Sequence, residues 1–293
     1  MRWRPSSQNQ IEDRRGSGGF GGGGLGSAGL GGGGIPIPMG GGIGGIVLVI
    51  IIFVIVQFLG GGGLGASQGG ATGSVDPNDE MGQFVNAVTV DVQKFWTQEF
   101  ADSGKSYTNT VTVLFTEGTQ TGCGVASSAT GPFYCPADKK VFLDPGFFQE
   151  LSTRFGAKGD FARAYVIAHE YGHHVQDLLG TMDQVQQQQT SSNANELSVR
   201  LELQADCYAG MWANWVMAHP DQSEVESITD QDVADGLGAA ASVGDDRIQE
   251  QATGTIDKES WTHGSSEQRM KWFNTGFRQG TLSACDTFGV AQP

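Results

Sequence analysis

The stretch VIAHEYGHHV, residues 166–175, places two histidines and a glutamate at the spacing His-Glu-x-x-His. On a helix, His169 and His173 lie four residues apart and project from one face, one turn from each other. Two imidazoles in that arrangement suit a tetrahedral zinc ion. Glu170 lies at the edge of the same face, where it can reach a metal-bound water without binding the metal. The stretch therefore predicts a helix that carries a catalytic zinc site.

The apolar residues before the motif indicate that this helix is buried. AYVIA, residues 164–168, immediately precedes His169, and such a run is typical of a protein core. Two imidazoles and a carboxylate in a core need a partner, for which a metal ion is the natural choice. The alternative is an exposed helix that happens to carry histidines. We interpret His174 in that ordinary way, because it points away from His169 and should lie at the surface.

A zinc hydrolase also needs a third protein ligand and an open coordination position. The segment ELQAD, which begins at Glu202, provides two carboxylates four residues apart on one face of a second expected helix. We predict that Glu202 is the third ligand and that Asp206 accepts a hydrogen bond from the free imidazole N–H of a zinc ligand. The spacing alone leaves Glu196 and Asp177 as alternative ligands.

The chain after residue 75 predicts an α+β fold in which helices predominate around a small sheet. Two β-branched stretches, 110–115 and 140–144, are predicted strands. A glutamine-rich connection, 184–195, leads into the second long predicted helix. Caps and apolar spacing predict helices that begin at Asp76 and Thr229, a short helix over 147–155, long helices over 160–180 and 196–218, and a last helix from Ser265 towards Arg278.

The charge of the chain argues against nucleic acid as a partner. The formal net charge is −15 over 293 residues. Residues 1–15 contribute +2, from four Arg and two Asp or Glu, whereas residues 76–293 contribute −17, from 13 Lys or Arg and 30 Asp or Glu. Binding to phosphates needs a basic face, which this acidic region does not predict.

An uncharged stretch with an apolar run separates these two regions. The run IVLVIIIFVIVQFL ends at Leu59, and together with Ile43 it offers seventeen residues of helix. Such a helix is roughly 25 Å long, slightly short of a hydrocarbon core of about 30 Å. A buried core helix is the alternative. We predict a disordered Arg-containing and Gly-rich segment over 1–42, a single transmembrane helix over 43–59, a flexible linker over 60–75, and a zinc metallopeptidase domain over 76–293.

The position of the arginines predicts how the chain is placed in the membrane. A cleavable signal peptide is the alternative to an anchor, but about thirty residues separate Arg15 from the apolar run. Because the arginines precede the span, the N-terminus should stay in the cytoplasm. We therefore expect a single-pass protein of the bacterial inner membrane, with its C-terminal domain in the periplasm or outside the cell.

The cysteines agree with a location outside the cytoplasm. All four lie beyond the apolar run, and an even number in an oxidising compartment predicts two disulfides. Cys123 and Cys135 enclose a loop of Gly, Ser and Pro that a local bridge could close, which by elimination pairs Cys207 with Cys285. A four-cysteine zinc site is the alternative, but it lacks paired Cys-x-x-Cys spacing.

Four motifs together resemble those of one known family. HEYGHH, ELQAD, HGSSEQR and FYCPADKKVFLD, with the arginine-containing start and the single apolar span, resemble the bacterial membrane-anchored family called "putative neutral zinc metallopeptidases". More distantly, the outer domain is similar to the Glu-zincins, which include the thermolysin type and the CAAX-processing endopeptidases. The resemblance implies a zincin-like domain with His169, His173 and Glu202 as ligands of Zn²⁺, Glu170 as the catalytic residue, and Asp206 in support.

A later segment resembles part of the same active sites. In the CAAX-processing group, a His-Pro-Ser segment followed by Arg lies near the active site, and here Gly264 replaces the proline. We predict that His263 stabilises the oxyanion and that Arg269 orients it or contacts substrate. The alternative is a histidine before a helix and a surface arginine. The strand at 140–144 could be a sheet edge that pairs with an extended peptide, or an ordinary core strand.

The sequence therefore predicts a membrane-tethered zinc endopeptidase that acts on a peptide or protein substrate. Zinc would activate a water, and Glu170 would serve as general base and then general acid. The alternatives are a non-catalytic tethered module that keeps zinc for structure, and an envelope scaffold without metal. Glu170 distinguishes them, because a purely structural zinc site needs no such carboxylate.

Overall fold

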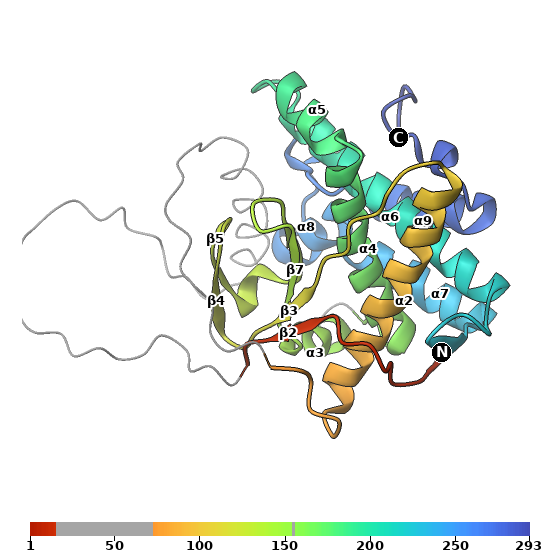
Figure 1. Ribbon diagram of the computed structural model, residues 1–293. Helices are drawn as coiled ribbons and strands as arrows, with labels where there is room; N and C mark the ends of the chain where they lie inside the picture. The colour runs from red at the N-terminus through yellow and green to blue at the C-terminus, as the bar shows by residue number, and fades with distance from the viewer. Residues whose placement is uncertain (16–72, 154–155) are drawn as a thin grey trace, which may run out of the picture.

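A computed structural model of the chain describes residues 1–15, 73–153 and 156–293. Figure 1 shows two long helices, α4 and α6, at the centre, with a small sheet on one side of α4 and the helices α7 and α9 on the other. The helices are α2 (Glu80–Asp102), α3 (Gly146–Thr153), α4 (Asp160–Leu178), α5 (Thr181–Gln188), α6 (Ala194–Ala218), α7 (Asp230–Ser242), α8 (Asp245–Thr253) and α9 (Ser266–Gln279). The strands are β1 (Arg2–Trp3), β2 (Ile11–Asp13), β3 (Thr112–Leu114), β4 (Gly118–Thr121), β5 (Gly124–Ser127), β6 (Phe133–Cys135), β7 (Lys140–Leu143) and β8 (Val225–Ser227). The predicted helix-rich α+β class is confirmed.

The main sheet has four strands in the order β2-β3-β7-β6. The first three strands are parallel, and β6 is antiparallel to β7. The strand predicted at 140–144 therefore lies inside the sheet as β7, which excludes it as an edge for a peptide. The edge strands are β2 and β6, neither of which the sequence predicted. A separate hairpin, β4–β5, extends beyond this sheet (Figure 1).

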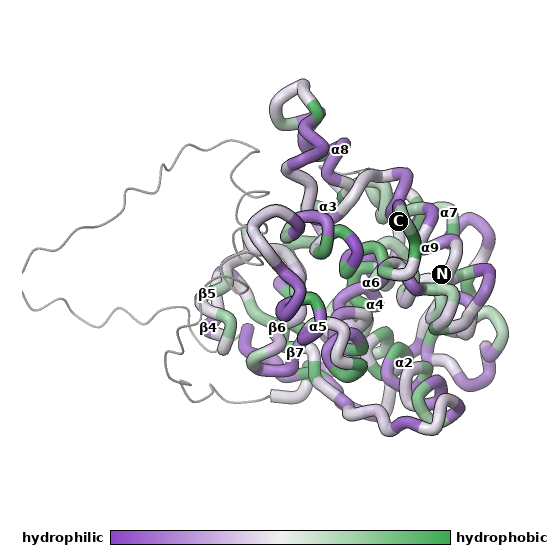
Figure 2. Tube along the Cα trace, turned by 90° about the horizontal axis from the view of Figure 1, so that it is seen from above, coloured by the Kyte–Doolittle hydropathy of each residue, from purple (hydrophilic) through white to green (hydrophobic). Residues whose placement is uncertain are grey.

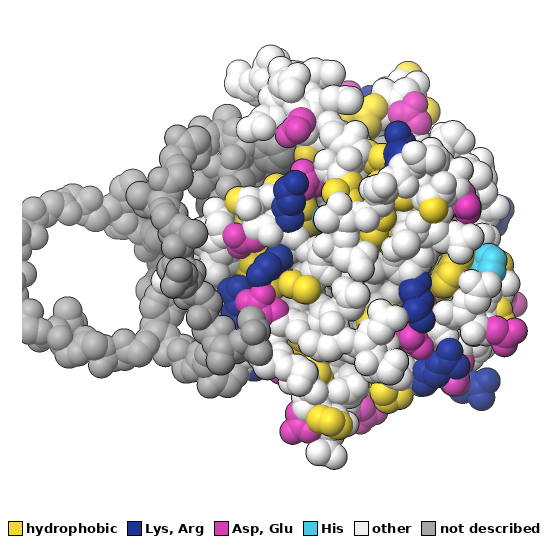
Figure 3. Space-filling view, in the orientation of Figure 1, with side chains coloured by type: hydrophobic (Ala, Val, Ile, Leu, Met, Phe, Trp, Pro, Cys, Tyr) yellow, Lys and Arg dark blue, Asp and Glu magenta, His cyan; other side chains and the backbone are white. Residues whose placement is uncertain are grey.

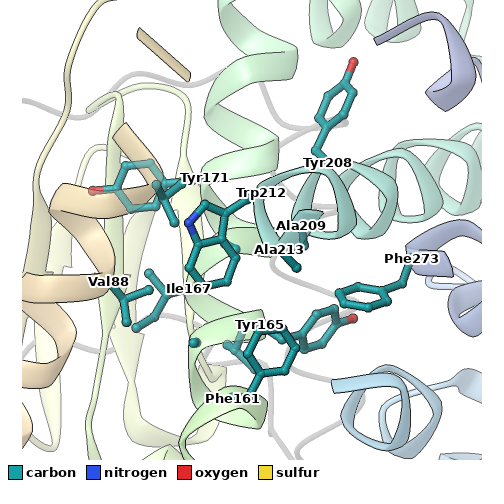
Figure 4. Packing of buried hydrophobic residues seen from close by; sticks show 14 of the residues in the cluster. Val88, Phe161, Tyr165, Ile167, Tyr171, Tyr208, Ala209, Trp212, Ala213 and Phe273 are labelled. Atoms are coloured by element: carbon teal, nitrogen blue, oxygen red, sulfur yellow. The ribbon is translucent and has the colours of Figure 1, made fainter. Parts of the chain in front are cut away.

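The core lies between α4, α6 and the elements packed against them. Figure 4 shows Trp212 of α6 beside Ile167 and Tyr171 of α4. Phe161 of α4 stacks on Trp212 and packs edge-on against Phe273 of α9. Trp212 is fully buried, and its indole N–H donates to the Asp91 carboxylate at 3.0 Å. Both long helices are apolar on several faces because each is covered on more than one side. Figure 2 shows the contrast with α8, which is mainly hydrophilic along its length.

Residues 1–15 belong to the same folded unit as residues 73–293. β1 pairs with β8, and β2 pairs with β3, where Ile11 is only 4% exposed within the main core. The chain leaves the described fold at Arg15 and re-enters it at Gly73, whose carbonyl accepts the Asp13 N–H at 3.3 Å. The prediction that residues 1–42 form a separate disordered segment, and that the domain begins only at residue 76, is therefore wrong for residues 1–15.

The same pairing bears on the predicted membrane topology. Backbone hydrogen bonds join the first strand region to β3, including Thr112 N–H to the Gln10 carbonyl at 3.1 Å and Arg14 N–H to the Leu114 carbonyl at 2.8 Å. Two segments that share a sheet lie on the same side of a membrane. These bonds argue against a cytoplasmic N-terminus with the rest of the domain in the periplasm, and the location of the chain stays a prediction.

Residues 11–15 are mostly charged, and for this reason the sequence did not predict that β2 is a strand of the main sheet. Glu12 pairs with Lys140 at 2.6 Å across the sheet and with Arg14 at 2.6 Å. Arg15 pairs with Asp13 at 2.6 Å and also with Asp79, the N-cap of α2. Acidic and basic side chains are interspersed on the face seen in Figure 3. Lys140 and Asp79 lie far along the chain, so the sequence around β2 does not reveal these two partners.

The predicted transmembrane helix, 43–59, lies outside the described residues. The same holds for 60–72 of the predicted linker. Among the residues that the structure describes, no helix is long and apolar enough to span a bilayer.

Most helix boundaries agree with the predictions, and the start of α2 differs. Ser265 and Gln268 form the predicted capping box of α9, and Thr229 caps α7. The helix expected from Asp76 begins instead at Glu80, because Asp79 accepts the Gly82 N–H. The first part of the glutamine-rich connection is helical, since α5 covers Thr181–Gln188.

Both predicted disulfides are present. Cys123 is bonded to Cys135, and Cys207 is bonded to Cys285. The described residues contain no free cysteine. The second bridge fastens the short 3-10 helix η3 (Leu282–Cys285) to α6, which is the helix that carries Glu202.

Candidate metal centre

The predicted zinc ligands come together where α4 and α6 touch. A side chain at Gly172 would lie 3.0 Å from the Cα atom of Ala205, so the glycine permits backbone-to-backbone approach. His169 and His173 flank this glycine on α4, and Glu202 precedes Ala205 on α6. The close contact therefore brings the His-Glu-x-x-His turn of one helix against the first carboxylate of ELQAD on the other.

The donor atoms of these three side chains lie close enough together to share one metal ion. His169 Nε2 lies 3.2 Å from one oxygen of Glu202, and His173 Nε2 lies 3.3 Å from the other. Zinc bonds of about 2.1 Å at the tetrahedral angle place neighbouring ligand atoms roughly 3.4 Å apart. Among the described residues, these three form the group of His, Cys, Asp and Glu that could hold a metal ion. The donor set therefore fits zinc.

Each histidine has its other ring nitrogen occupied by the protein. Nδ1 of His169 lies 2.8 Å from the Asp206 carboxylate, and Nδ1 of His173 lies 2.9 Å from Oε1 of Gln176. Both acceptors hold the proton on Nδ1 and leave the Nε2 lone pair free for a metal. The role predicted for Asp206 agrees with this placement.

The charges of the site also favour a cation. Burial opposes protonation of His169, but the carboxylates of Asp206 and Glu202 outweigh it and raise the pKa of His169 to about 10. Burial likewise opposes ionisation of Glu202, yet His173 and His169 hold the pKa of that carboxyl well below its usual range. Two buried carboxylates thus attract positive charge, which a zinc ion supplies more strongly than protons do.

Arg269 forms the other side of the Asp206 network. Its guanidinium is 4% exposed and donates to both oxygens of Asp206, from Nε at 2.8 Å and from Nη2 at 2.9 Å. It also donates to the Tyr165 hydroxyl and to the Val243 carbonyl. None of its hydrogen bonds within the described residues reaches His263. This geometry makes Arg269 a support for Asp206, whereas the sequence suggested a contact with His263 or substrate.

Glu170 lies beside the ligand cluster and below the edge of the sheet. Its side chain is 7% exposed, and burial raises the pKa of its carboxyl, while His169 and His173 act in the opposite direction. The backbone N–H of Tyr134, on edge strand β6, also favours the ionised form. A carboxyl whose pKa is raised, but which can still ionise, suits a general base near neutral pH.

His263 approaches the site from the loop before α9. Its Nδ1 lies 3.2 Å from the Asp245 carboxylate, which also accepts the backbone N–H groups of residues 262, 263 and 264. Although burial opposes it, Asp245 and then Glu202 raise the pKa of His263. Glu202 affects the pKa of His263 because His263 lies near the ligand cluster. Since Nδ1 contacts Asp245, Nε2 is the ring nitrogen that can donate to a substrate. Gly264 has φ of +88°, a conformation that proline cannot adopt, so the loop needs its departure from His-Pro-Ser.

His174 is not the surface residue that the sequence suggested. It is 1% exposed and lies between the Tyr134 hydroxyl, 3.1 Å from Nδ1, and the Thr108 carbonyl, 2.8 Å from Nε2. The Tyr134 hydroxyl in turn donates to Asp177 at 2.7 Å. The opposite face of α4 is covered by the sheet, so this histidine fastens edge strand β6 to the helix that carries the motif.

Sequence reasoning missed three residues that shape this site. Asp245 begins α8 and has no motif that links it to His263. Tyr165 belongs to the apolar run before the motif and was counted only as core. Gln176 could have been found from the sequence, because it follows His173 by three residues on a helix that was predicted to be buried. The structure places it fully inside the protein.

Known proteins resemble this chain along its length. It is 42% identical over 304 residues to the Escherichia coli (strain K12) protein designated "Uncharacterized protein YpfJ", with 99% of each chain covered. It is 51% identical over 190 residues to an uncharacterised protein of Mycobacterium tuberculosis (strain H37Rv), which covers 63% of this chain and 64% of that protein. No solved structure matches. Residues 1–288 match the family described as "Putative neutral zinc metallopeptidase", and the chain belongs to that family.

Proposed function

We propose that this protein is a zinc-dependent endopeptidase. The observation that carries the proposal is a donor set whose ligand atoms lie within 4.8 Å of one another, His169, His173 and Glu202, with Glu170 buried beside it. A structural zinc site does not need a carboxylate such as Glu170 beside the ligands, whereas a hydrolytic zinc site does. Family membership supports the same chemistry, with Zn²⁺ as the cofactor and a peptide or protein as the substrate.

The side chains around the cluster have separate tasks in this proposal. When bound, zinc lowers the pKa of a coordinated water to about 7 and so supplies a nucleophile at neutral pH. Glu170 takes the proton of the attacking water and delivers it to the leaving amine. His263, held by Asp245 through Nδ1, donates from Nε2 to the carbonyl oxygen as it becomes negative. Asp206 and Arg269 keep His169 in place throughout.

The edge of the main sheet supports an extended substrate. β6 has β7 as its one neighbour among the described strands and so lies at the end of the main sheet nearest Glu170, where an extended peptide could align with it. Tyr134 on this strand also contacts Glu170 through its backbone N–H. A peptide aligned with β6 would therefore run past Glu170, the proposed general base, with its carbonyl groups aligned with the site.

Removal of the metal tests the proposed function. The full chain, purified in detergent, should contain one zinc per molecule and cleave a quenched-fluorescent peptide library or casein. Dialysis against a chelator should abolish cleavage, and one equivalent of zinc should restore it, because the nucleophile depends on the ion. Elemental analysis and a cleavage assay on the same sample measure both quantities.

Matched histidine variants separate a specific site from adventitious zinc. His173→Ala should not retain stoichiometric zinc, whereas His219→Ala should, since His219 lies at the far end of α6 and stacks on Trp215. Equal zinc content in the two variants would refute the ligand assignment. Zinc bound normally but without any cleavage would refute the peptidase proposal and favour the structural module.

We also propose attachment to a membrane through residues 43–59, with both flanking parts on the non-cytoplasmic side. The apolar run supports attachment, and the two disulfides favour an oxidising compartment. Since residues 1–15 share a sheet with β3, both ends of the undescribed range return to one side. This proposal replaces the single crossing that the sequence suggested.

Cysteine labelling in cells tests this arrangement. Ser7→Cys and Ser106→Cys place single thiols at exposed positions, one before the apolar run and one after it. In intact Escherichia coli cells, both should react with a maleimide that does not cross the inner membrane. Labelling of Ser106→Cys alone, with Ser7→Cys reacting only after lysis, would mean that the N-terminal strands do not join the domain in the cell.

A further inference from the structure

The imidazole of His173 is oriented by a buried amide. Gln176 is fully buried and lies three residues after His173 on α4, with its Oε1 atom 2.9 Å from Nδ1 of the histidine. Its Nε2 group donates to the Leu201 carbonyl at 2.7 Å and to Oε1 of Gln204 at 3.1 Å. The Leu201 carbonyl belongs to the peptide group that carries Glu202. One side chain thus connects two of the proposed zinc ligands across the helix pair.

The direction of these hydrogen bonds is fixed by two backbone carbonyls. Gln204 donates from Nε2 to the Cys285 carbonyl at 3.0 Å, so its Oε1 must face Gln176. Gln176 then presents Nε2 to Gln204 and to the Leu201 carbonyl, which leaves Oε1 for His173. A backbone carbonyl can only accept. Reversal of either amide would therefore set oxygen against oxygen inside a dry interface.

This direction decides which nitrogen of His173 carries the proton. Because Gln176 offers an oxygen, Nδ1 must donate, and the lone pair remains on Nε2, which faces Glu202 at 3.3 Å. Cys285, at the far end of the chain of amides, is held against α6 by its disulfide to Cys207. The C-terminal segment is thereby connected to the metal centre without touching it.

We propose that Gln176 and Gln204 form a polar relay that positions His173 for metal binding from the disulfide-held carbonyl of Cys285. The relay fixes the tautomer and the aim of His173, and the bond from Gln176 to the Leu201–Glu202 peptide keeps that imidazole in register with the third ligand. Gln176 is a positioning residue, since it acts through His173. The proposal rests on the proposed zinc site and adds to it a second support, equivalent to the one Asp206 gives His169.

Zinc affinity and the tautomer of His173 test the relay. Gln176→Leu keeps the volume and removes the acceptor, so we expect zinc affinity to fall about 10–100-fold in a chelator competition, the usual effect of losing such a partner. Long-range ¹H–¹⁵N correlation spectra of the zinc-free chain should show His173 protonated at Nδ1 in the parent protein. The same spectra of Gln176→Leu should show a mixture of tautomers. Gln204→Leu should shift the tautomer in the same direction to a smaller extent.

Gln188→Leu, at the exposed end of α5, is the matched control and should change neither quantity. Parental zinc affinity, or a parental His173 spectrum, in Gln176→Leu would overturn the proposal. A Gln204→Leu variant that is less stable yet has the parental tautomer would assign Gln204 to packing alone and would overturn the relay from Cys285. Neither readout uses hydrolysis. A protein that binds zinc through His173 but cleaves nothing would refute the peptidase proposal and leave the relay intact.

Discussion

Glu170→Gln should retain one zinc per chain and lose peptide cleavage by about 10²–10⁴-fold in kcat, the usual contribution of a general base. Glutamine has almost the same shape as glutamate but cannot accept the proton of the attacking water. The three ligand atoms, from His169, His173 and Glu202, are unchanged by the substitution. Zinc content by elemental analysis and single-substrate kinetics on the same preparation measure the two effects.

Glu267→Gln is the control for this variant. It makes the same chemical change at an exposed position of α9 and should leave both zinc content and cleavage unaltered. Loss of zinc from Glu170→Gln would show that Glu170 is itself a ligand and that the site has another architecture. Undiminished cleavage would require a different base.

Arg269→Met should destabilise the fold by about 3–5 kcal/mol, which is the usual consequence of leaving one partner of a buried ion pair. The Asp206 carboxylate is fully buried, and Arg269 donates to both of its oxygens. Methionine fills similar space and leaves Asp206 with only His169 and Tyr165. Denaturant unfolding of the zinc-free full chain in detergent, compared with the parent chain, measures the loss.

Two companion variants distinguish support of Asp206 from a direct role in substrate binding. Arg278→Met, at an exposed position on the same helix, should cost less than about 0.5 kcal/mol. Adding Asp206→Asn to Arg269→Met removes the unpaired charge and should recover part of the lost stability. A single Arg269→Met variant with parental stability and a raised KM would contradict our interpretation and return Arg269 to the substrate-contacting role.

The metal cluster could be predicted because its information is local. His169 and His173 are brought together by one helical turn, and Glu202 and Asp206 by another, so spacing alone defines both pairs. What spacing cannot give is the distance between the two helices. Here that distance depends on Gly172 against Ala205, a contact that is visible only after folding.

The parts that sequence reasoning missed depend on partners far along the chain. β2 is a three-residue strand of mixed character in which Lys140 neutralises Glu12, and Arg15, just after the strand, pairs with Asp79. Nothing in the sequence around His174 indicates that it is buried, because its partners Tyr134 and Thr108 come from the sheet side of α4. In each case a polar residue is buried because its partner arrives from another element, and periodicity records only the apolar residues.

The short strand β2 also has a practical consequence for the study of this protein. A soluble fragment that begins after the apolar run would lack Ile11 and the backbone groups that β2 offers to β3. Its main sheet would then end at β3, a strand whose three residues are all fully buried in the intact chain. Bare edges of buried apolar strands recruit strands from neighbouring molecules and lead to aggregation. Poor behaviour of such a truncated fragment would therefore report the missing strand and would say nothing about the catalytic competence of the zinc site.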